Sequence, residues 1–294
     1  MANNITPELQ AEASPYGILS PASVVIQAGD GAWETKLEYT DYTCNSRTSI
    51  EGICIPGITE PITAVDGSGD GGYIHEYRPF SIETEFTCST IGMTPEEVQE
   101  RAENALLACR QKAIEVEFSS GLLSKKITEA DETIVNSYLT DGLANDLTSG
   151  TAVSPRTGLA MLEQSIADCG CGTRGTIHGQ PLATSFLSKY LKNNKTNTEN
   201  DYLETRLGNY VISGSGYTGE SPTGVDTSGT ETYLYATGRV LVVLGDVNVY
   251  PSDTNRRYEA IDISNNTVRY AVSQTAAVVS SGCCKSAVLV DITK

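Results

Sequence analysis

The most regular hydrophobic pattern in the chain lies between residues 94 and 118. Thr94, Pro95 and Glu97 are typical of a helix start, with an N-cap, a proline in the first turn and a capping box. Apolar side chains then recur at helical spacing, at Val98, Ala102, Ala105, Cys109, Ala113 and Val116. This pattern predicts a helix from Thr94 to about Phe118, about 35 Å long, with one apolar face.

Two further helices are predicted downstream. In "SPRTGLAMLEQSIADCG", Ser154 is the expected N-cap, Pro155 opens the helix, and one face carries Leu159, Leu162 and Ile166. After a short predicted strand in "TRGTIHG", the segment "QPLATSFLSKYLKNN" predicts a third helix that begins at Pro181. Its apolar positions are Leu182, Phe186, Leu187, Tyr190 and Leu191.

From residue 209 onward the pattern changes to that of strands. The β-branched runs are "NYVIS", "TYLYAT", "RVLVVLGDVNVY", "RYEAIDI", "NTVRYAV" and "KSAVLVDI", with turn signals between them. No internal repeat is evident. Together with the predicted helices, these runs indicate an α+β protein.

The first eighty residues contain no self-sufficient unit. Residues 1–30 resemble an extended arm interrupted by three prolines, which must lie on the body or on a neighbouring subunit. From about Trp33 to Phe80 the chain alternates outward and back around a Gly- and Asp-rich stretch, "GITEPITAVDGSGDGGY". This pattern predicts a long two-stranded hairpin with its tip at "DGSGDGG". Because such a hairpin is marginal alone, we expect it to lean on a partner.

Composition narrows the possible functions. With 294 residues the chain can bury one large core or two modest ones. Its net charge of −17 and the lack of a basic stripe argue against tight nucleic-acid binding, although such a surface tolerates packed DNA nearby. No apolar run approaches the length of a membrane span, and the N-terminal residues do not resemble a signal peptide. We therefore expect reduced thiols, with most of the eight cysteines as small buried hydrophobic residues.

Cys169, Cys171 and His178 form the one local cluster with metal-ligand chemistry. It offers three ligands where zinc prefers four, and its C-x-C spacing is tighter than usual. A helix end followed by a turn explains the same residues. His178 and His75 are the only histidines, no G-x-S-x-G is present, and we expect His178 to be a hydrogen-bonded structural residue.

Nucleotide binding is also disfavoured. G-x-G-x-x-G occurs three times, beginning at Gly67, Gly170 and Gly214, but never between a predicted strand and a predicted helix. The carboxylates are scattered. We predict no catalytic, metal-binding or cofactor-binding residue, and hence no enzyme and no cofactor.

Several segments resemble the major capsid proteins of tailed double-stranded DNA phages, which have the Hong Kong 97-like fold. They are similar, more narrowly, to actinobacteriophage-type head proteins. The likeness is carried by "YRPFSIETEFTCSTIG", "RAENALLACRQKAIEVEFSSG", "GLAMLEQSIADCGCGTRGTIHGQP", "YATGRVLVVLGDVNVYP" and "NTVRYAVSQTAAVVSSGCCKSAVLV".

The resemblance implies a domain plan: an N-terminal arm (1–30), an extended hairpin loop (31–82), a peripheral domain with the spine helix (83–150 and 236–294) and an axial domain (151–235). It also implies a subunit that assembles with itself, as hexamers and pentamers, into an icosahedral shell around DNA that it does not bind specifically. Portal, scaffolding and minor or decoration proteins are the implied partners, and the virion, assembled in the host cytoplasm, is the implied location.

The hairpin supplies the expected contacts between subunits. Tyrosine and arginine commonly anchor interfaces, and its flanks carry Tyr39, Tyr42, Tyr73, His75, Tyr77, Arg78 and Phe80. No lysine occurs from Asp41 to Tyr77, so these contacts are expected to be non-covalent. Two alternatives stay open: an encapsulin-like compartment shell, and a cytosolic enzyme with an unrecognised site.

Overall fold

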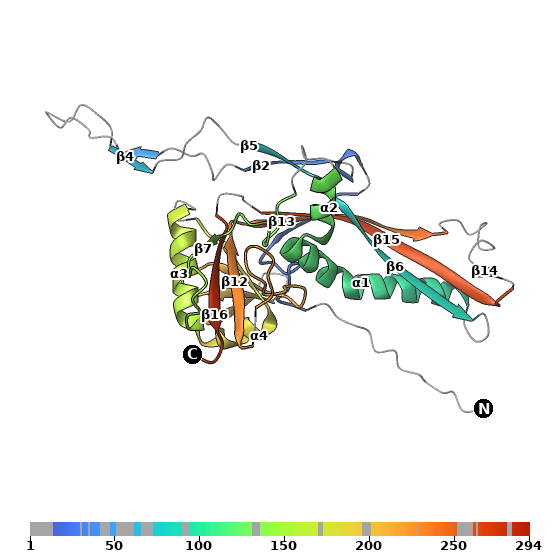
Figure 1. Ribbon diagram of the computed structural model, residues 1–294. Coiled ribbons are helices and arrows are strands. Elements are labelled where there is room, and N and C mark those ends of the chain that lie inside the picture. The colour runs from blue at the N-terminus through green and yellow to red at the C-terminus, as the bar shows by residue number, and fades with distance from the viewer. Residues whose placement is uncertain are drawn as a thin grey trace.

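The computed structural model describes residues 14–29, 31–34, 36–41, 48–50, 62–65, 73–89, 94–130, 136–169, 173–195, 201–227, 229–251, 261–262, 264–280 and 284–294. Two sheets meet around a shared hydrophobic core, one of them extended along a long helix (Figure 1). A separate two-stranded ribbon projects from this body. The mixed α+β architecture is the predicted one.

The first sheet has seven strands. Their spatial order is β7 (Asn145–Asp146), β16 (Ser286–Asp291), β12 (Glu231–Thr237), β8 (Thr176–Gly179), β11 (Tyr210–Ser213), β10 (Asp201–Thr205) and β9 (Leu191–Lys195). Its central strands bury side chains on both faces, because alternate residues of a strand point to opposite sides and each side packs into a hydrophobic cluster. On β12, Tyr233 and Tyr235 enter the shared core, whereas Leu234 and Ala236 enter a second cluster beneath α3 (Pro155–Cys169).

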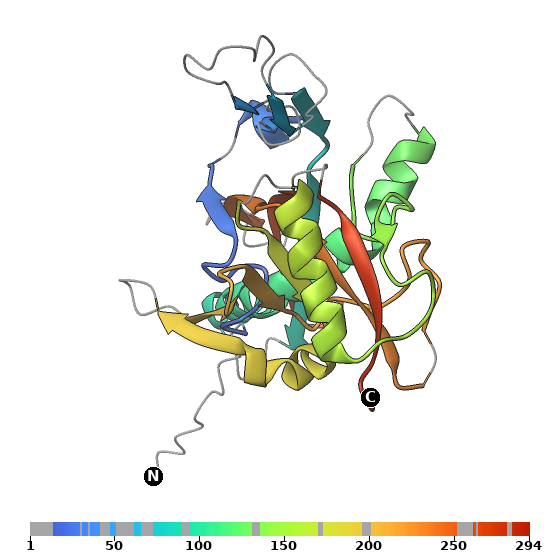
Figure 2. The same cartoon turned by 90° about the vertical axis from the view of Figure 1, so that its left-hand side faces the viewer.

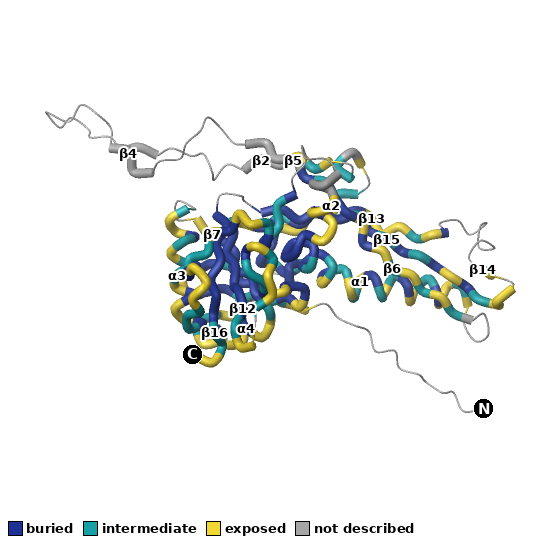
Figure 3. The backbone as a smooth tube through the Cα atoms, viewed as in Figure 1, coloured by how far each residue is buried: buried dark blue, intermediate teal, exposed yellow. Residues whose placement is uncertain are grey.

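The second sheet runs beside the longest helix. It contains β1 (Val24–Gln27), β13 (Val240–Tyr250), β15 (Thr267–Ser280), β14 (Ile261–Asp262) and β6 (Phe80–Ser89). Helix α1 (Pro95–Ser120) packs on β15 and β6. Buried residues concentrate in the seven-stranded sheet and where α1 meets it, and the outer parts of α1, β6 and β15 are more exposed (Figure 3).

Helix α1 begins as predicted. Thr94 accepts a hydrogen bond from the Glu97 amide at 3.3 Å, and the Glu97 side chain accepts one from the Thr94 amide at 2.7 Å. The buried face differs from the predicted one. After Val98 and Ala102 the buried apolar positions are Leu106, Ile114 and Phe118. Because this row advances four residues at a time, it drifts around the helix and leaves Cys109 exposed.

The segment after Pro181 is helical for a shorter stretch than predicted. Helix α4 (Pro181–Phe186) is followed by a 3₁₀ turn, η2 (Ser188–Tyr190), and then by β9. Leu187 is fully buried, whereas Leu182 and Phe186 are exposed. Backbone pairing of β9 with β10 replaces the expected helical turns. A helix that the sequence reasoning did not predict, α2 (Leu122–Ala130), follows α1.

The described part of the N-terminal arm lies on the body of its own chain. Strand β1 pairs in parallel with β13, and the Ser213 amide donates to the Tyr16 carbonyl. The carboxylate of Glu115, fully buried in α1, accepts from the Ile18 amide at 3.0 Å and the Gly216 amide at 2.9 Å. Burial raises the pKa of Glu115, and the two amide donors oppose that shift. One carboxylate thus joins the arm, the helix and the loop after β11.

The projecting ribbon consists of two antiparallel pairs. Strand β2 (Leu37–Asp41), preceded by a 3₁₀ turn η1 (Ala32–Glu34), pairs with β5 (Tyr73–Tyr77), and β3 (Thr48–Ile50) pairs with β4 (Ile62–Val65). The predicted hairpin is therefore present. Its end, however, falls between β3 and β4, whereas the predicted tip "DGSGDGG" lies outside the described residues, between β4 and β5.

The last strand belongs to the seven-stranded sheet. Strand β16 pairs antiparallel with β12 and contacts α3. Strand β16 alternates between the two hydrophobic clusters just as β12 does. Strands β13 and β15 lie beside α1. The division of the chain into an arm, a hairpin loop, a peripheral domain and an axial domain stays a prediction.

Candidate assembly surfaces

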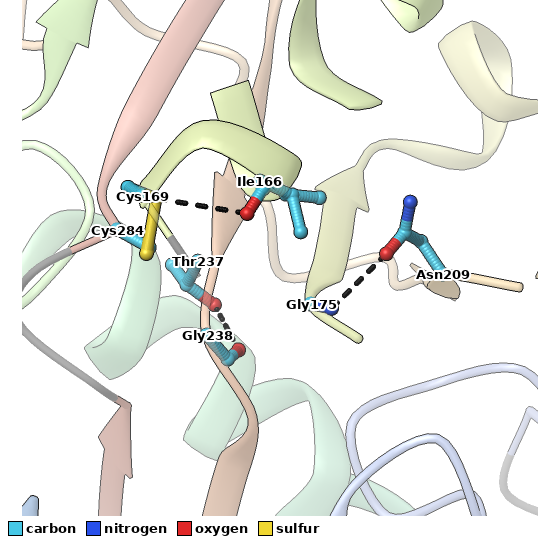
Figure 4. Close-up of a disulfide and its surroundings, with 7 residues drawn as sticks. All are labelled: Ile166, Cys169, Gly175, Asn209, Thr237, Gly238 and Cys284. Carbon is cyan, nitrogen blue, oxygen red and sulfur yellow. Dashed lines mark hydrogen bonds between the residues drawn. A yellow bond between two sulfur atoms is a disulfide. The ribbon is translucent and has the colours of Figure 1, made fainter. Parts of the chain in front are cut away.

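One cysteine of the predicted cysteine-histidine cluster forms a disulfide bond with a cysteine outside it. Cys169, at the end of α3, forms a disulfide with Cys284, just before β16, with a Cα–Cα distance of 5.5 Å (Figure 4). The expectation of reduced, unlinked thiols is therefore wrong for this pair. The two cysteines are 115 positions apart in the sequence, and only the packing of α3 on β16 brings them together. Cys171 lies outside the described residues.

His178 is a structural residue, as predicted. It is fully buried on β8; Nδ1 lies 3.1 Å from the Tyr217 hydroxyl and Nε2 lies 2.8 Å from the Thr237 hydroxyl. The ring packs edge-on against Phe118, with 5.3 Å between centroids. Burial lowers the pKa of His178 to about 3, so the imidazole is neutral near pH 7. It has no access to a substrate.

The described residues contain no metal-binding constellation. No three His, Cys, Asp or Glu side chains gather there in a way that would hold an ion. No helix in the same part of the chain is both long enough and apolar enough to cross a bilayer.

The predicted contact residues of the hairpin divide into two groups. Tyr39 lies on β2, and Tyr73 and His75 lie on β5, with Tyr39 opposite His75; Tyr42 lies outside the described residues. Tyr77 and Phe80, at the root of the hairpin, are only 3% and 7% exposed, because they pack into the core of their own chain. They have little surface to offer to a neighbour. The interface role of the outer residues stays a prediction.

Arg78 and Asn136 fasten the root of the hairpin to the body. The Arg78 amide donates to the Asn136 side-chain oxygen, and the Asn136 side-chain amide donates back to the Arg78 carbonyl, both at 2.8 Å. Asn136 is buried. Sequence reasoning missed it because a polar residue 58 positions away carries no local signal.

An apolar groove lies beside this root. It has a volume of about 440 Å³ and runs between β6, the second half of α1 and the start of α2. Ile82, Val116, Leu122 and Leu123 line it, with Lys112 and Glu117 among its polar residues. Leu122 and Leu123 are exposed. Such a surface on a soluble protein is typical of a contact site.

Comparison with known proteins identifies the fold. No protein-family model matches the chain, and no curated protein matches it by sequence. The chain is similar to the holo-SrpI encapsulin complex from Synechococcus elongatus, at 11% identity over 100% of this chain and 94% of that chain, with a TM-score of 0.52.

Two further structures are about as similar to this chain. The capsid of an empty GTA particle matches at 10% identity over 99% of this chain and 94% of that chain, with a TM-score of 0.53. A structure from Gordonia phage Cozz matches at 14% identity over 99% and 91%, with a TM-score of 0.50. These likenesses establish the fold: the chain has the Hong Kong 97-like fold that these shell structures share. The predicted fold is confirmed.

Proposed function

We propose that this protein is the subunit of a closed icosahedral shell, built from hexamers and pentamers of the same chain. The observation that carries the proposal is the two-stranded ribbon, β2 with β5 and β3 with β4. Two-stranded pairs of this kind have marginal stability alone. This ribbon projects from the body and pairs with no other strand among the described residues (Figure 1). A neighbouring copy supplies the surface that such a ribbon needs.

The groove beside the hairpin root is the surface that we assign to that contact. It is apolar and exposed, and it lies against β6 and α1, which every copy presents. In the proposed shell the outer residues of the ribbon, Tyr39, Tyr73 and His75, lie on the neighbour at or near this groove. The contacts are non-covalent, because residues 41–77 contain no lysine to form a cross-link.

A tailed-phage capsid is the finer function that we propose, located in the virion and assembled in the host cytoplasm. Two observations support a phage capsid: the structural match to Gordonia phage Cozz, and the resemblance of the sequence segments quoted above to phage head proteins. The net charge of −17 suits a wall that encloses packed DNA without binding it tightly. Portal, scaffolding and decoration proteins are its further proposed partners. A cellular encapsulin-like compartment is the second candidate, supported by the SrpI match.

Electron microscopy and light scattering of the purified protein test the shell. We expect capsomers or closed particles; a compact monomer at every concentration would refute the proposal. Nuclease treatment followed by analysis of the contents separates the two shell types. Protected double-stranded DNA indicates a capsid, and a protein cargo without DNA indicates an encapsulin-like compartment.

A further inference from the structure

The seven-stranded sheet ends in two edges of different character. β9 and β7 are its outermost strands, on opposite sides, and no further strand pairs with either among the described residues. Figure 2 shows β9, in yellow, on the opposite side of α3 from the green segment that contains β7. A contact that joins identical copies head to tail needs two such different surfaces on one chain.

The two most exposed large hydrophobic side chains of the described residues occupy these two sides. Leu207, 78% exposed, lies in the turn between β10 and β11, and Leu143, 73% exposed, lies just before β7. Single exposed leucines are common on soluble proteins. Their positions and the charges around them therefore carry the argument.

Both leucines are held on ordered turns. Around Leu207, the Gly208 amide donates to the Thr205 carbonyl at 3.1 Å, and the Thr205 amide donates to the Asn209 carbonyl at 2.8 Å. Beside Leu143, the Gly142 amide donates to the Pro222 carbonyl at 2.8 Å. This last bond brings the turn that contains exposed Val225 next to Leu143. Preorganised apolar groups lose little entropy on binding.

The strand register places the two turns at the same end of the sheet. The turn with Leu207 leads into Tyr210, and pairing then continues step by step across the sheet to Asn145, two residues after Leu143. The residues on this path are Tyr210, Thr176, Thr237, Ala236, Ser286 and Asn145. A copy placed beside another therefore brings one turn against the other without sliding along the strands.

The charged side chains of the two sides differ in balance: basic residues predominate beside Leu207, and acidic residues lie with Lys125 on the side of Leu143. Lys189, Lys192 and Arg206 are exposed around Leu207, and the Arg206 guanidinium donates to the Lys189 carbonyl at 3.2 Å. Asp226 is exposed next to Val225, and Glu220 lies near Gly224 in the same turn, where Lys125 also approaches. We name Lys189, Lys192, Arg206 and Leu207 the basic edge patch, and Leu143, Glu220, Val225 and Asp226 the acidic edge patch.

We propose that copies of this chain join head to tail within a capsomer, with the basic edge patch of one copy against the acidic edge patch of the next. The inference rests on the proposed shell function and goes beyond it by naming the surfaces. Leu207 packs against Leu143 and Val225, and Arg206 and Lys192 face Asp226 and Glu220. A contact between two different patches repeats around a ring, as a capsomer requires.

Mixing two blocked variants tests this directly. Leu207→Asp disrupts one patch and Leu143→Asp the other, so neither variant alone has an intact pair of edge patches, and each should associate about 30-fold more weakly than the wild type. Mixed in equal amounts, they should form dimers that neither variant forms alone, because one intact pair of edge patches remains between the two variants. Sedimentation velocity measures this. Leu182→Asp, at an exposed position on α4 outside both patches, is the matched control and should assemble normally.

Charge exchange provides a second test. Arg206→Glu and Asp226→Lys should each weaken association, and the double variant should recover most of the loss. Circular dichroism establishes that each variant is folded. If the wild type assembles and both leucine variants assemble equally well, or if their mixture yields no dimer, the head-to-tail contact is overturned. A wild type that never assembles instead refutes the proposed shell function.

Discussion

At the scale of single residues, a buried polar seam lies between the seven-stranded sheet and α1. His178, Tyr217 and Thr237 form hydrogen bonds within it, and Glu115 raises the pKa of Tyr217 further, after the larger effect of burial. Each of these groups is satisfied by a partner distant in sequence. Such networks specify one packing arrangement, because an unpaired buried polar atom is costly.

The seam predicts a specific pH dependence. The pKa of His178 is lowered by burial from 6.5 to about 3, so the native state stays neutral where the unfolded chain binds a proton. The contribution of neutral His178 to the free energy of unfolding is therefore fully present above about pH 6.5. It is lost as the pH falls toward 3, by up to about 1.4 kcal/mol per pH unit. Denaturant unfolding of wild type and His178→Gln between pH 4 and 7 measures it.

The free energy of unfolding of His178→Gln should change less steeply with pH than that of the wild type. Glu115, whose pKa is raised, acts in the opposite sense, since its contribution grows as the pH falls. It is present in both proteins, so the difference between their slopes isolates His178. Identical slopes would mean that the imidazole is protonated, or accessible to solvent, in the native state.

The disulfide is a second residue-scale feature open to test. Closing a loop between Cys169 and Cys284 restricts the unfolded chain, and we expect reduction to lower the free energy of unfolding by about 2–4 kcal/mol. Melting curves with and without a reductant measure this. Cys109→Ser, at an exposed free thiol, should respond to reductant like the wild type, whereas Cys169→Ser/Cys284→Ser should not respond. Peptide mapping that finds no linked pair would contradict the assignment.

At the scale of elements, predictions from sequence succeeded where the determinants are local. The caps of α1 and α3 lie within a few residues of the helices that they start, so Thr94, Pro95 and Ser154 were sufficient. The predictions failed where a strand depends on pairing with a segment distant in sequence. Strand β9 exists because β10 pairs with it, and β1 because β13 offers its edge. Neither signal appears in the pattern of the segment itself.

A close approach between elements gives the next prediction. A Cβ added at Gly216 would lie 2.5 Å from the Lys112 carbonyl oxygen and 2.8 Å from the Val116 amide, both backbone atoms of α1 that cannot turn aside. Gly216→Ala should therefore cost about 1–3 kcal/mol of stability. Gly31→Ala, whose added Cβ would lie 3.6 Å from Trp33, is the control and should be near neutral. Chemical unfolding of the two variants compares their stabilities. Equal stability would mean that the loop after β11, which contains Gly216, shifts away from α1 without cost.

At the scale of the whole molecule, the candidate surfaces were only partly predictable. Composition identified the aromatic-rich hairpin, but alternation alone could not show that Tyr77 and Phe80 face the core of their own chain. The edge patches depend on sheet order and register, since Leu207 and Leu143 are 64 residues apart. Isolated exposed leucines in turns carry no signal until the strands are placed.

The last prediction concerns the ribbon as an assembly device. Asp41 on β2 and Tyr73 on β5 are directly paired, so residues 42–72 can be replaced by Asn-Gly, which closes a tight hairpin at that point. The body should fold with near-native helix content by circular dichroism, because α1, α3 and both sheets lie outside the replaced residues. Joining of capsomers should fail, or should yield fragile and irregular particles, because the proposed clamp on the neighbour is gone.

A matched control makes this outcome specific. Lys195 on β9 and Asp201 on β10 are also directly paired, so residues 196–200 can be replaced by the same Asn-Gly turn. This second shortening leaves the ribbon and the exposed residues of the basic edge patch in place, and it should assemble like the wild type. Electron microscopy and thermal challenge of the two variants compare them. Normal, heat-resistant particles from the variant without residues 42–72 would show that the ribbon is not what holds neighbouring subunits together.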